Sequence, residues 1–116
     1  NLLSGHVRDR QAGAVVVDAA GGRFTATVDE GRTTPASGGE ATVMIRPENL
    51  RLHGDTFVGT VRDVGYMGAH REYAVALNAG PTLQVRSGND GDGVSVGDTV
   101  GIGVAAAAVV DPGGNG

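Results

Sequence analysis

Arg46 and Glu48 are opposite charges two residues apart, on either side of Pro47, and could form an ion pair at a functional surface. They lie where one strand-like segment, 41–46, gives way to the next, 50–52. Both segments alternate apolar and polar side chains, the pattern of a half-buried strand. A residue before proline is driven to extended backbone, and side chains two apart on an extended chain point the same way. The two charges could therefore pair, which at an exposed position contributes about 0–1 kcal/mol. The alternative, that both charges are simply solvated where a strand ends, stays open.

Two further patterns resemble parts of known sites. Gly101, Gly103 and Ala106 fit GxGxx[GA], but they lie in a strand-like stretch without the helix that a dinucleotide site requires. We predict a strand face of small residues there instead. Asp90 and Asp92 match the start of a calcium loop, but the next ligand position is not acidic and no helices flank it. A solvated hairpin loop is the prediction for that segment.

The remaining candidate groups are scattered along the chain. No histidines show the spacing of a zinc site, no serine lies in a nucleophile elbow, and no two carboxylates are placed for acid–base catalysis. We therefore predict a non-catalytic domain with no metal site. His70, with its neighbour Arg71, is kept as a candidate ligand contact because it follows the glycine-bounded loop 65–68. The histidines are His6, His53 and His70, and the serines are Ser4, Ser37, Ser87 and Ser95.

Composition excludes several classes of protein. The chain has 116 residues, the length of one domain, and it has no cysteine, which rules out disulfides and thiolate metal sites. No apolar run is long enough to span a membrane. The net charge is −4, there are only four Phe and Tyr residues, and there is no Trp. Without a basic footprint or stacking platforms, nucleic-acid binding is not expected.

Short strand-like runs alternate with turns along the whole chain, which predicts an all-β sandwich or barrel. Glycine makes up 21 of the 116 residues and separates runs rich in Val and Thr, as expected for turns between strands. A hairpin turn is predicted at 19–23, with Gly21 and Gly22 both at positive φ. The predicted strands cover residues 6–10, 14–18, 24–29, 41–46, 50–52, 56–64, 71–78, 82–86 and 99–105.

The order of motifs resembles the C-terminal TOBE (transport-associated oligonucleotide-binding-like) domain of ATPase subunits from bacterial ABC importers. The resemblance covers nearly the whole chain. The stretch from Tyr66 to Tyr73 and the ending at Val110 are most similar to the polyamine and iron(III) importer branch. The matching motifs are Asn1, Leu2, Leu3 and Gly5; Ile45, Arg46, Pro47 and Glu48; Tyr66, Met67 and Gly68; and Gly97 with Asp98.

The resemblance implies an OB-like β-barrel of short antiparallel strands in a single domain, 1–110. It would consist of an N-terminal hairpin unit (1–30), a loop (31–40) and the main barrel (41–110), followed by a flexible tail (111–116). The implied role is regulation and dimerisation of an importer ATPase subunit at the inner face of the cell membrane. Its partners would be a second subunit copy, its own nucleotide-binding domain and the membrane subunits. Arg46, Pro47 and Glu48 would form the interface motif, and Tyr66, Met67 and Gly68 the family-motif loop.

The chain departs from a complete ATPase subunit in one respect. It has no GxxxxGK[ST] phosphate loop and no lysine at all, so ATP and Mg²⁺ would belong to a domain upstream of Asn1, and no cofactor is predicted here. The family also contains modules that bind molybdate or tungstate. A small-ligand binding module, for an oxyanion or a transported substrate, is therefore the alternative function.

Overall fold

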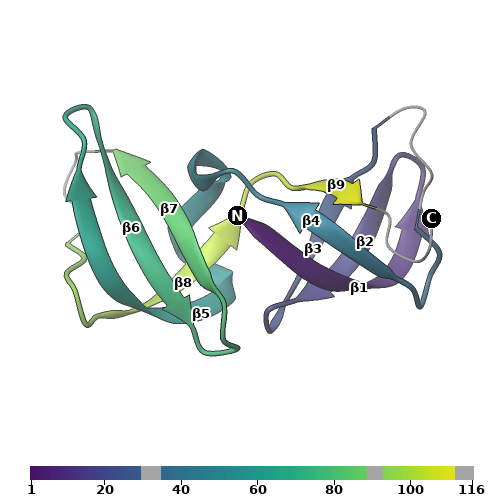
Figure 1. Ribbon diagram of the computed structural model, residues 1–116, viewed down its shortest axis with the longest axis horizontal. Helices are drawn as coiled ribbons and strands as arrows, with labels where there is room; N and C mark the ends of the chain where they lie inside the picture. Colours follow the sequence, from purple (N-terminus) through teal and green to yellow (C-terminus); the bar gives the residue numbers. More distant parts are fainter. Residues whose placement is uncertain (30–34, 89–92, 112–116) are drawn as a thin grey trace.

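Figure 1 shows the computed structural model of the chain, which describes residues 1–29, 35–88 and 93–111. These ranges contain nine β-strands and one 3-10 turn, η1, which confirms the predicted all-β class. The strands form two lobes side by side, a first lobe of β1–β4 with β9 and a second lobe of β5–β8. The elements are β1 (Leu2–Gln11), β2 (Ala14–Ala19), β3 (Gly22–Thr27), β4 (Glu40–Met44), η1 (Pro47–Asn49), β5 (Leu50–Tyr66), β6 (His70–Leu77), β7 (Thr82–Gly88), β8 (Thr99–Val104) and β9 (Ala108–Asp111).

The first lobe is a closed barrel with the strand order β1-β2-β3-β9-β4. Antiparallel ladders join most neighbours, and a parallel bridge between Thr27 and Ala108 joins β3 to β9. Successive side chains of a strand face opposite sides, so alternate residues fill the barrel while their neighbours face solvent. The barrel interior holds mainly small and β-branched side chains, namely Val7, Val15, Val17, Ala26, Val43 and Val109.

The second lobe is a four-stranded sheet with the order β7-β6-β5-β8. Its long strand β5 pairs with β6 along its second half and with β8 along its first half. The inner face of this sheet is lined by larger residues than the barrel interior. Tyr73 and Phe57 are the largest fully buried side chains among the described residues. The other members are Val61, Val75, Leu83, Val85 and Ile102.

A bulge in β5 explains the glycines of β8. The register between β5 and β8 shifts between Leu52 and Phe57, so the intervening residues loop over the neighbouring strand. A Cβ on Gly101 would overlap the carbonyl oxygen of Gly54, and a Cβ on Gly54 would overlap the backbone of Gly103. Only glycine allows backbones to approach this closely. The prediction of a small-residue strand face is confirmed, and these glycines do not form a nucleotide loop.

The division of the chain differs from the predicted one. We expected 41–110 to form the main barrel, with 1–30 packed on it as an accessory hairpin. In the structure, strands from 1–30 supply most of the closed barrel, which is completed by β4 and by β9 from the far end of the chain. The inner faces of β1, β2 and β3 are apolar, and these strands alone, as an accessory unit, would leave part of them exposed. Strand β9 covers them by a pairing that local sequence patterns do not encode.

The β2–β3 turn also differs from its prediction by one residue. Ala20 and Gly21 take positive φ, at 52° and 84°, whereas Gly22 does not. Gly22 is needed for a different reason, because a Cβ there would overlap the carbonyl oxygen of Thr56 and lie 2.9 Å from the Phe57 ring. The β2–β3 hairpin of the first lobe therefore packs directly against β5 of the second lobe.

One hydrophobic core runs through both lobes. The Phe24 and Phe57 rings meet edge to face across the lobe boundary, with centroids 5.7 Å apart. In the described part of the chain no helix is long and apolar enough to cross a membrane. Part of the predicted loop 31–40, the predicted tail beyond Asp111, and the weighed calcium ligands Asp90 and Asp92 lie outside the described residues.

Candidate functional site

The connector between the lobes begins at Arg46, whose backbone is extended with φ −70° and ψ 146°. Pro47 then starts η1, and the Asn49 amide donates to the Arg46 carbonyl over 2.9 Å. The predicted strand break at proline is confirmed. None of the ion pairs among the described residues joins Arg46 to Glu48. Arg46 is extended but Glu48 lies in the 3-10 turn, so their side chains do not follow the two-residue period of one strand.

Glu48 instead begins a chain of charges across the outer face of the second lobe. Its carboxylate lies 4.0 Å from Arg86 Nη1, and Arg86 Nη2 donates to Glu72 Oε1 over 3.0 Å. Glu72 in turn lies 3.7 Å from His70 Nε2, a contact that is ionic only when the imidazole is protonated. This series of charged contacts links Glu48 to His70, two predicted site residues that are far apart in the sequence.

The predicted motif loop forms the turn from β5 to β6. Tyr66 is 73% exposed and Met67 is 52% exposed, and Gly68 takes a positive φ of 83° that favours glycine. The Met67 amide donates to the His70 carbonyl over 2.8 Å, which fixes the turn. The Arg71 guanidinium lies over the Tyr66 ring, 5.2 Å from its centroid, within the range of a cation–π contact. Two large side chains are thus held at the surface.

A small cavity lies where the two connectors between the lobes cross. The connectors touch through a hydrogen bond from the Ala105 amide to the Asn49 carbonyl, 2.8 Å long. The cavity has a volume of about 140 Å³. Among the described residues, Arg46 is the only charged one that lines the cavity, and it belongs to none of the ion pairs that they form. The lining consists of Thr27, Met44, Arg46, Asn49, Ala106, Ala107 and Ala108. We call this the junction cavity.

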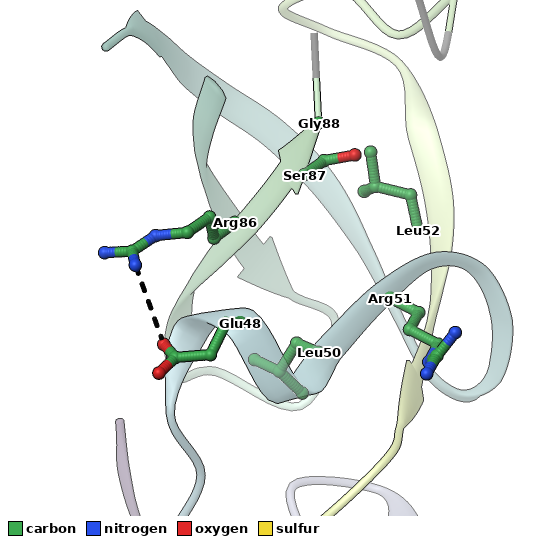
Figure 2. Close-up of a pocket in the computed structure, with 7 residues that line it drawn as sticks. All are labelled: Glu48, Leu50, Arg51, Leu52, Arg86, Ser87 and Gly88. Carbon is green, nitrogen blue, oxygen red and sulfur yellow. Dashed lines mark ion pairs between the residues drawn. The ribbon is translucent and has the colours of Figure 1, made fainter. Parts of the chain in front are cut away.

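A second cavity, of about 400 Å³, lies between the end of β7 and the start of β5, and we call it the seam cavity. Figure 2 shows Arg86 and Glu48 paired at one side of it and Arg51 turned away from that pair, with the Ser87 hydroxyl directed toward Leu52. Basic, acidic and apolar groups are therefore mixed in its walls. They are Glu48, Leu50, Arg51, Leu52, Arg86, Ser87 and Gly88.

Asn1 links the two lobes through its side chain. Its Nδ2 donates to the carbonyls of Ile45 and Gln84 over 3.0 and 2.9 Å, and its Oδ1 accepts from the Gln84 amide over 2.7 Å. The carboxamide thus uses both donor hydrogens and its oxygen. Asn1 lies between the lobes in Figure 1, where it fastens the end of β4 to β7.

A separate charge cluster lies on the outside of the barrel. Arg23 Nε donates to Asp18 Oδ1 over 2.8 Å, and Arg8 Nε lies 3.3 Å from the other carboxylate oxygen. The Arg23 hydrogen bond is the main reason that the pKa of Asp18 is lowered, with smaller contributions from the charges of Arg23, Arg8 and His6. The same bond raises the pKa of Arg23. An open cavity of about 470 Å³ lies beside this cluster, along Gly21 and Gly22.

Sequence reasoning missed three parts of this region. Glu72 and Arg86 face each other across β6 and β7, and the phase of alternation around the predicted 78–81 turn contained enough information to pair them. Asn1 was identified only as part of a family motif. Its hydrogen bonds to Gln84 join residues 83 positions apart, and such a contact leaves no local pattern in the sequence. The junction cavity joins Thr27 to Arg46 through the unexpected strand β9, so its lining could not be assembled from the sequence.

Comparison with known proteins gives a family and a fold. A family model described as "TOBE domain" matches residues 43–110, more than half of the chain. No curated protein sequence matches it significantly. Among solved structures, a crystal form of the cytoplasmic molybdate-binding protein ModG, with molybdate bound, is similar over 95% of this chain and 93% of that one. The TM-score is 0.75 at 20% sequence identity, so the likeness is one of fold and is consistent with the OB-like barrel predicted from the sequence.

Proposed function

Because the chain belongs to the TOBE domain family, we propose that it is a non-catalytic binding module whose ligand is a small oxyanion. The observation that carries the proposal is the fold shared, over almost all of both chains, with a protein crystallised with molybdate bound. A fold hosts many functions, so the ligand has to be argued from a site in this chain. The junction cavity is that site.

The chemistry of the junction cavity favours an anion. The Arg46 guanidinium offers planar, paired N–H donors suited to two oxygens of one anion, and none of the described residues that line the cavity is a carboxylate that would compete with it. Asn49 adds a carboxamide, whereas the Thr27 hydroxyl already donates its hydrogen to the Ala107 carbonyl over 3.3 Å. The volume of 140 Å³ equals that of roughly four or five water molecules, enough for a tetrahedral anion with four oxygens. A bound anion would be held between the two connectors.

Calorimetric titration of the chain with molybdate, sulfate and spermidine tests this function. Molybdate or sulfate should bind at micromolar strength, and the cation spermidine should not. Arg46→Gln should weaken oxyanion binding about 10-fold or more, because a hydrogen bond to a charged group contributes about 1.5–3 kcal/mol. Arg51→Gln is the matched control, since it removes the same charge from an exposed residue outside the junction cavity. Absence of oxyanion binding, or equal losses in both variants, would contradict the proposal.

A second candidate function is regulation and dimerisation of an ABC importer ATPase. It is favoured by the order of the family motifs and by the position of Arg46, Pro47 and Glu48 in the connector between the lobes. In this function, the partners are a second ATPase subunit, a nucleotide-binding domain and the membrane subunits. The domain itself uses no cofactor and works in the cytoplasm, beside the membrane.

The two functions make different predictions. Regulation predicts a phosphate loop and a Leu-Ser-Gly-Gly-Gln signature encoded upstream of Asn1, and a dimeric mass by light scattering. It also predicts that Arg46→Ala weakens the coupling of ATP hydrolysis to transport without loss of stability. Unchanged coupling would remove this role from Arg46, and ATP hydrolysis by the isolated domain would contradict both functions.

A further inference from the structure

The two lobes differ in how their sheets end. The first lobe is closed by five strands, the last of which, β9, arrives from the far end of the chain. The second lobe has four strands in the order β7-β6-β5-β8, so β7 is an edge strand with β6 as its one ladder partner among the described strands. The seam cavity lies between this edge and the start of β5. The second lobe therefore has room beside an unpaired edge where the first lobe has a strand.

The orientation of the β7 peptide groups follows from one hydrogen-bonded residue. The Gln84 amide and carbonyl both bond to the Asn1 side chain, so they point away from β6. Opposed residues in an antiparallel ladder alternate between bonded and non-bonded pairs, and Arg86 lies two residues from Gln84. The pairs Ala74–Gln84 and Glu72–Arg86 are two positions apart in the same ladder, so both are pairs without hydrogen bonds between β6 and β7. The Arg86 amide and carbonyl therefore also point away from β6, along the seam cavity.

Asn1 shows what this edge accepts. A carboxamide has the same donor and acceptor pair as a peptide group, and the Asn1 side chain makes with Gln84 the two bonds that a neighbouring strand would make. One position of a fifth strand is therefore already occupied by a side chain of the protein. The next equivalent position, at Arg86, has no backbone hydrogen-bond partner on this side among the described residues, and it opens on the seam cavity of about 400 Å³.

The cavity walls define the side chains that a strand placed there would need. Arg86 lies on the outer face of β7, with Glu72, and its Nη1 is only loosely paired with Glu48 at 4.0 Å. A residue opposite Arg86 on an added strand would project to that same face, so a carboxylate suits it. Its two neighbours would project to the inner face, where Leu50 is buried and Leu52 half-buried. Apolar residues suit those positions.

We propose that β7 is a strand-addition site for an extended peptide of a partner protein, with a carboxylate residue between two apolar residues. Main-chain bonds to Arg86 supply the pairing, and the alternating side chains supply the specificity, as in other complexes that extend a sheet edge. This inference concerns the seam cavity and does not depend on oxyanion binding at the junction cavity.

The probe is the peptide acetyl-Thr-Val-Glu-Val-Thr-amide, and the readout is amide hydrogen exchange followed by NMR. In the free protein the Arg86 amide should exchange fast, whereas the Val85 amide, which points to β6, should be protected. Saturating probe should slow the Arg86 amide about 10-fold or more, because a paired amide must open before it exchanges. The same peptide methylated on the Glu nitrogen is the matched control and should lose this protection.

Variants at Ser87 test the place of binding. Ser87→Tyr fills the seam cavity and should abolish the protection of Arg86, whereas Ser87→Ala should keep it. Both variants should keep the slow exchange of the Val85 amide, which shows that β7 is still folded onto β6 and keeps this test independent of the oxyanion function. The inference is overturned if the probe leaves Arg86 exchange unchanged, or if the methylated peptide or Ser87→Tyr binds equally well. Protection that rises with protein concentration alone would identify a second copy as the occupant and would also overturn it.

Discussion

Arg46 and Glu48 belong to one short motif, but their side chains line different cavities. The 3-10 turn directs Glu48 toward Arg86 and the seam cavity, while Arg46 lines the junction cavity. A pair two residues apart would have contributed little as an exposed ion pair. Their separation leaves Arg46 without a carboxylate partner among the described residues. An exposed guanidinium without an ion pair, at the edge of a small open cavity, is the basis of the oxyanion proposal.

Asn1→Ala should lower the free energy of unfolding by about 1–3 kcal/mol, because it removes three hydrogen bonds and leaves two carbonyls and one amide without their partner. Urea denaturation measures this change. Asn78→Ala is the matched control, since Asn78 is exposed in the β6–β7 turn and should change stability by less than about 0.5 kcal/mol. Equal effects of the two substitutions would show that Asn1 does not fasten the lobes together.

Asp18 should titrate below its ordinary value of 3.8, because Arg23 donates a hydrogen bond to the charged form. A pKa lowered in the folded state stabilises the protein above the unfolded pKa, and this contribution is lost as the pH falls through the folded pKa. The stability difference between the parent chain and Asp18→Asn should therefore shrink in acid, below about pH 4.

NMR titration of the Asp18 carboxyl group measures this pKa directly. Arg23→Gln should raise it back toward 3.8, and Arg8→Gln should raise it less, since the charge of Arg8 is a smaller cause than the Arg23 bond. A pKa that is unchanged in Arg23→Gln would contradict the assignment of the shift to that hydrogen bond.

At the scale of the elements, the regular hairpins were predictable and the long-range closures were not. Alternation within 71–78 and 82–86 predicts β6 and β7 closely, because each strand buries one face and the turn between them is marked by Asn, Gly and Pro. By contrast, β5 runs unbroken through 50–66, where two strands were expected, because its bulge is stabilised by close contact with the β8 glycines. Strand β9 was missed because it pairs only with strands distant in the sequence.

Gly22→Ala tests the packing of the β2–β3 hairpin on β5. The new methyl group would overlap the Thr56 carbonyl and touch the Phe57 ring, and overpacking of this kind costs about 1–3 kcal/mol. Gly13→Ala is the control, since it places a side chain at a positive φ of 73° but in open space. Both variants should lose stability, but only Gly22→Ala should also shift the NMR signals of Phe57. Unshifted Phe57 signals would contradict the close approach of the two lobes.

At the scale of the whole molecule, the two proposed sites follow from how the chain crosses between the lobes. The chain passes from the first lobe to the second through Arg46 and η1 and returns through 105–107, so the two connectors border the junction cavity, which is open to solvent. The motif residues at one connector could be identified from the sequence. The cavity itself could not, because three of its seven lining residues, Ala106, Ala107 and Ala108, come from the returning segment and the start of β9.

The position of bound molybdate tests the oxyanion proposal most directly. Anomalous X-ray scattering from crystals grown with molybdate locates the metal atom without any assumption about its ligands. The proposal predicts a strong peak in the junction cavity, with anion oxygens within hydrogen-bond distance of Arg46 and Asn49, and a weaker peak in Arg46→Gln at the same molybdate concentration. A peak elsewhere in the chain, or crystals that bind no molybdate, would contradict it.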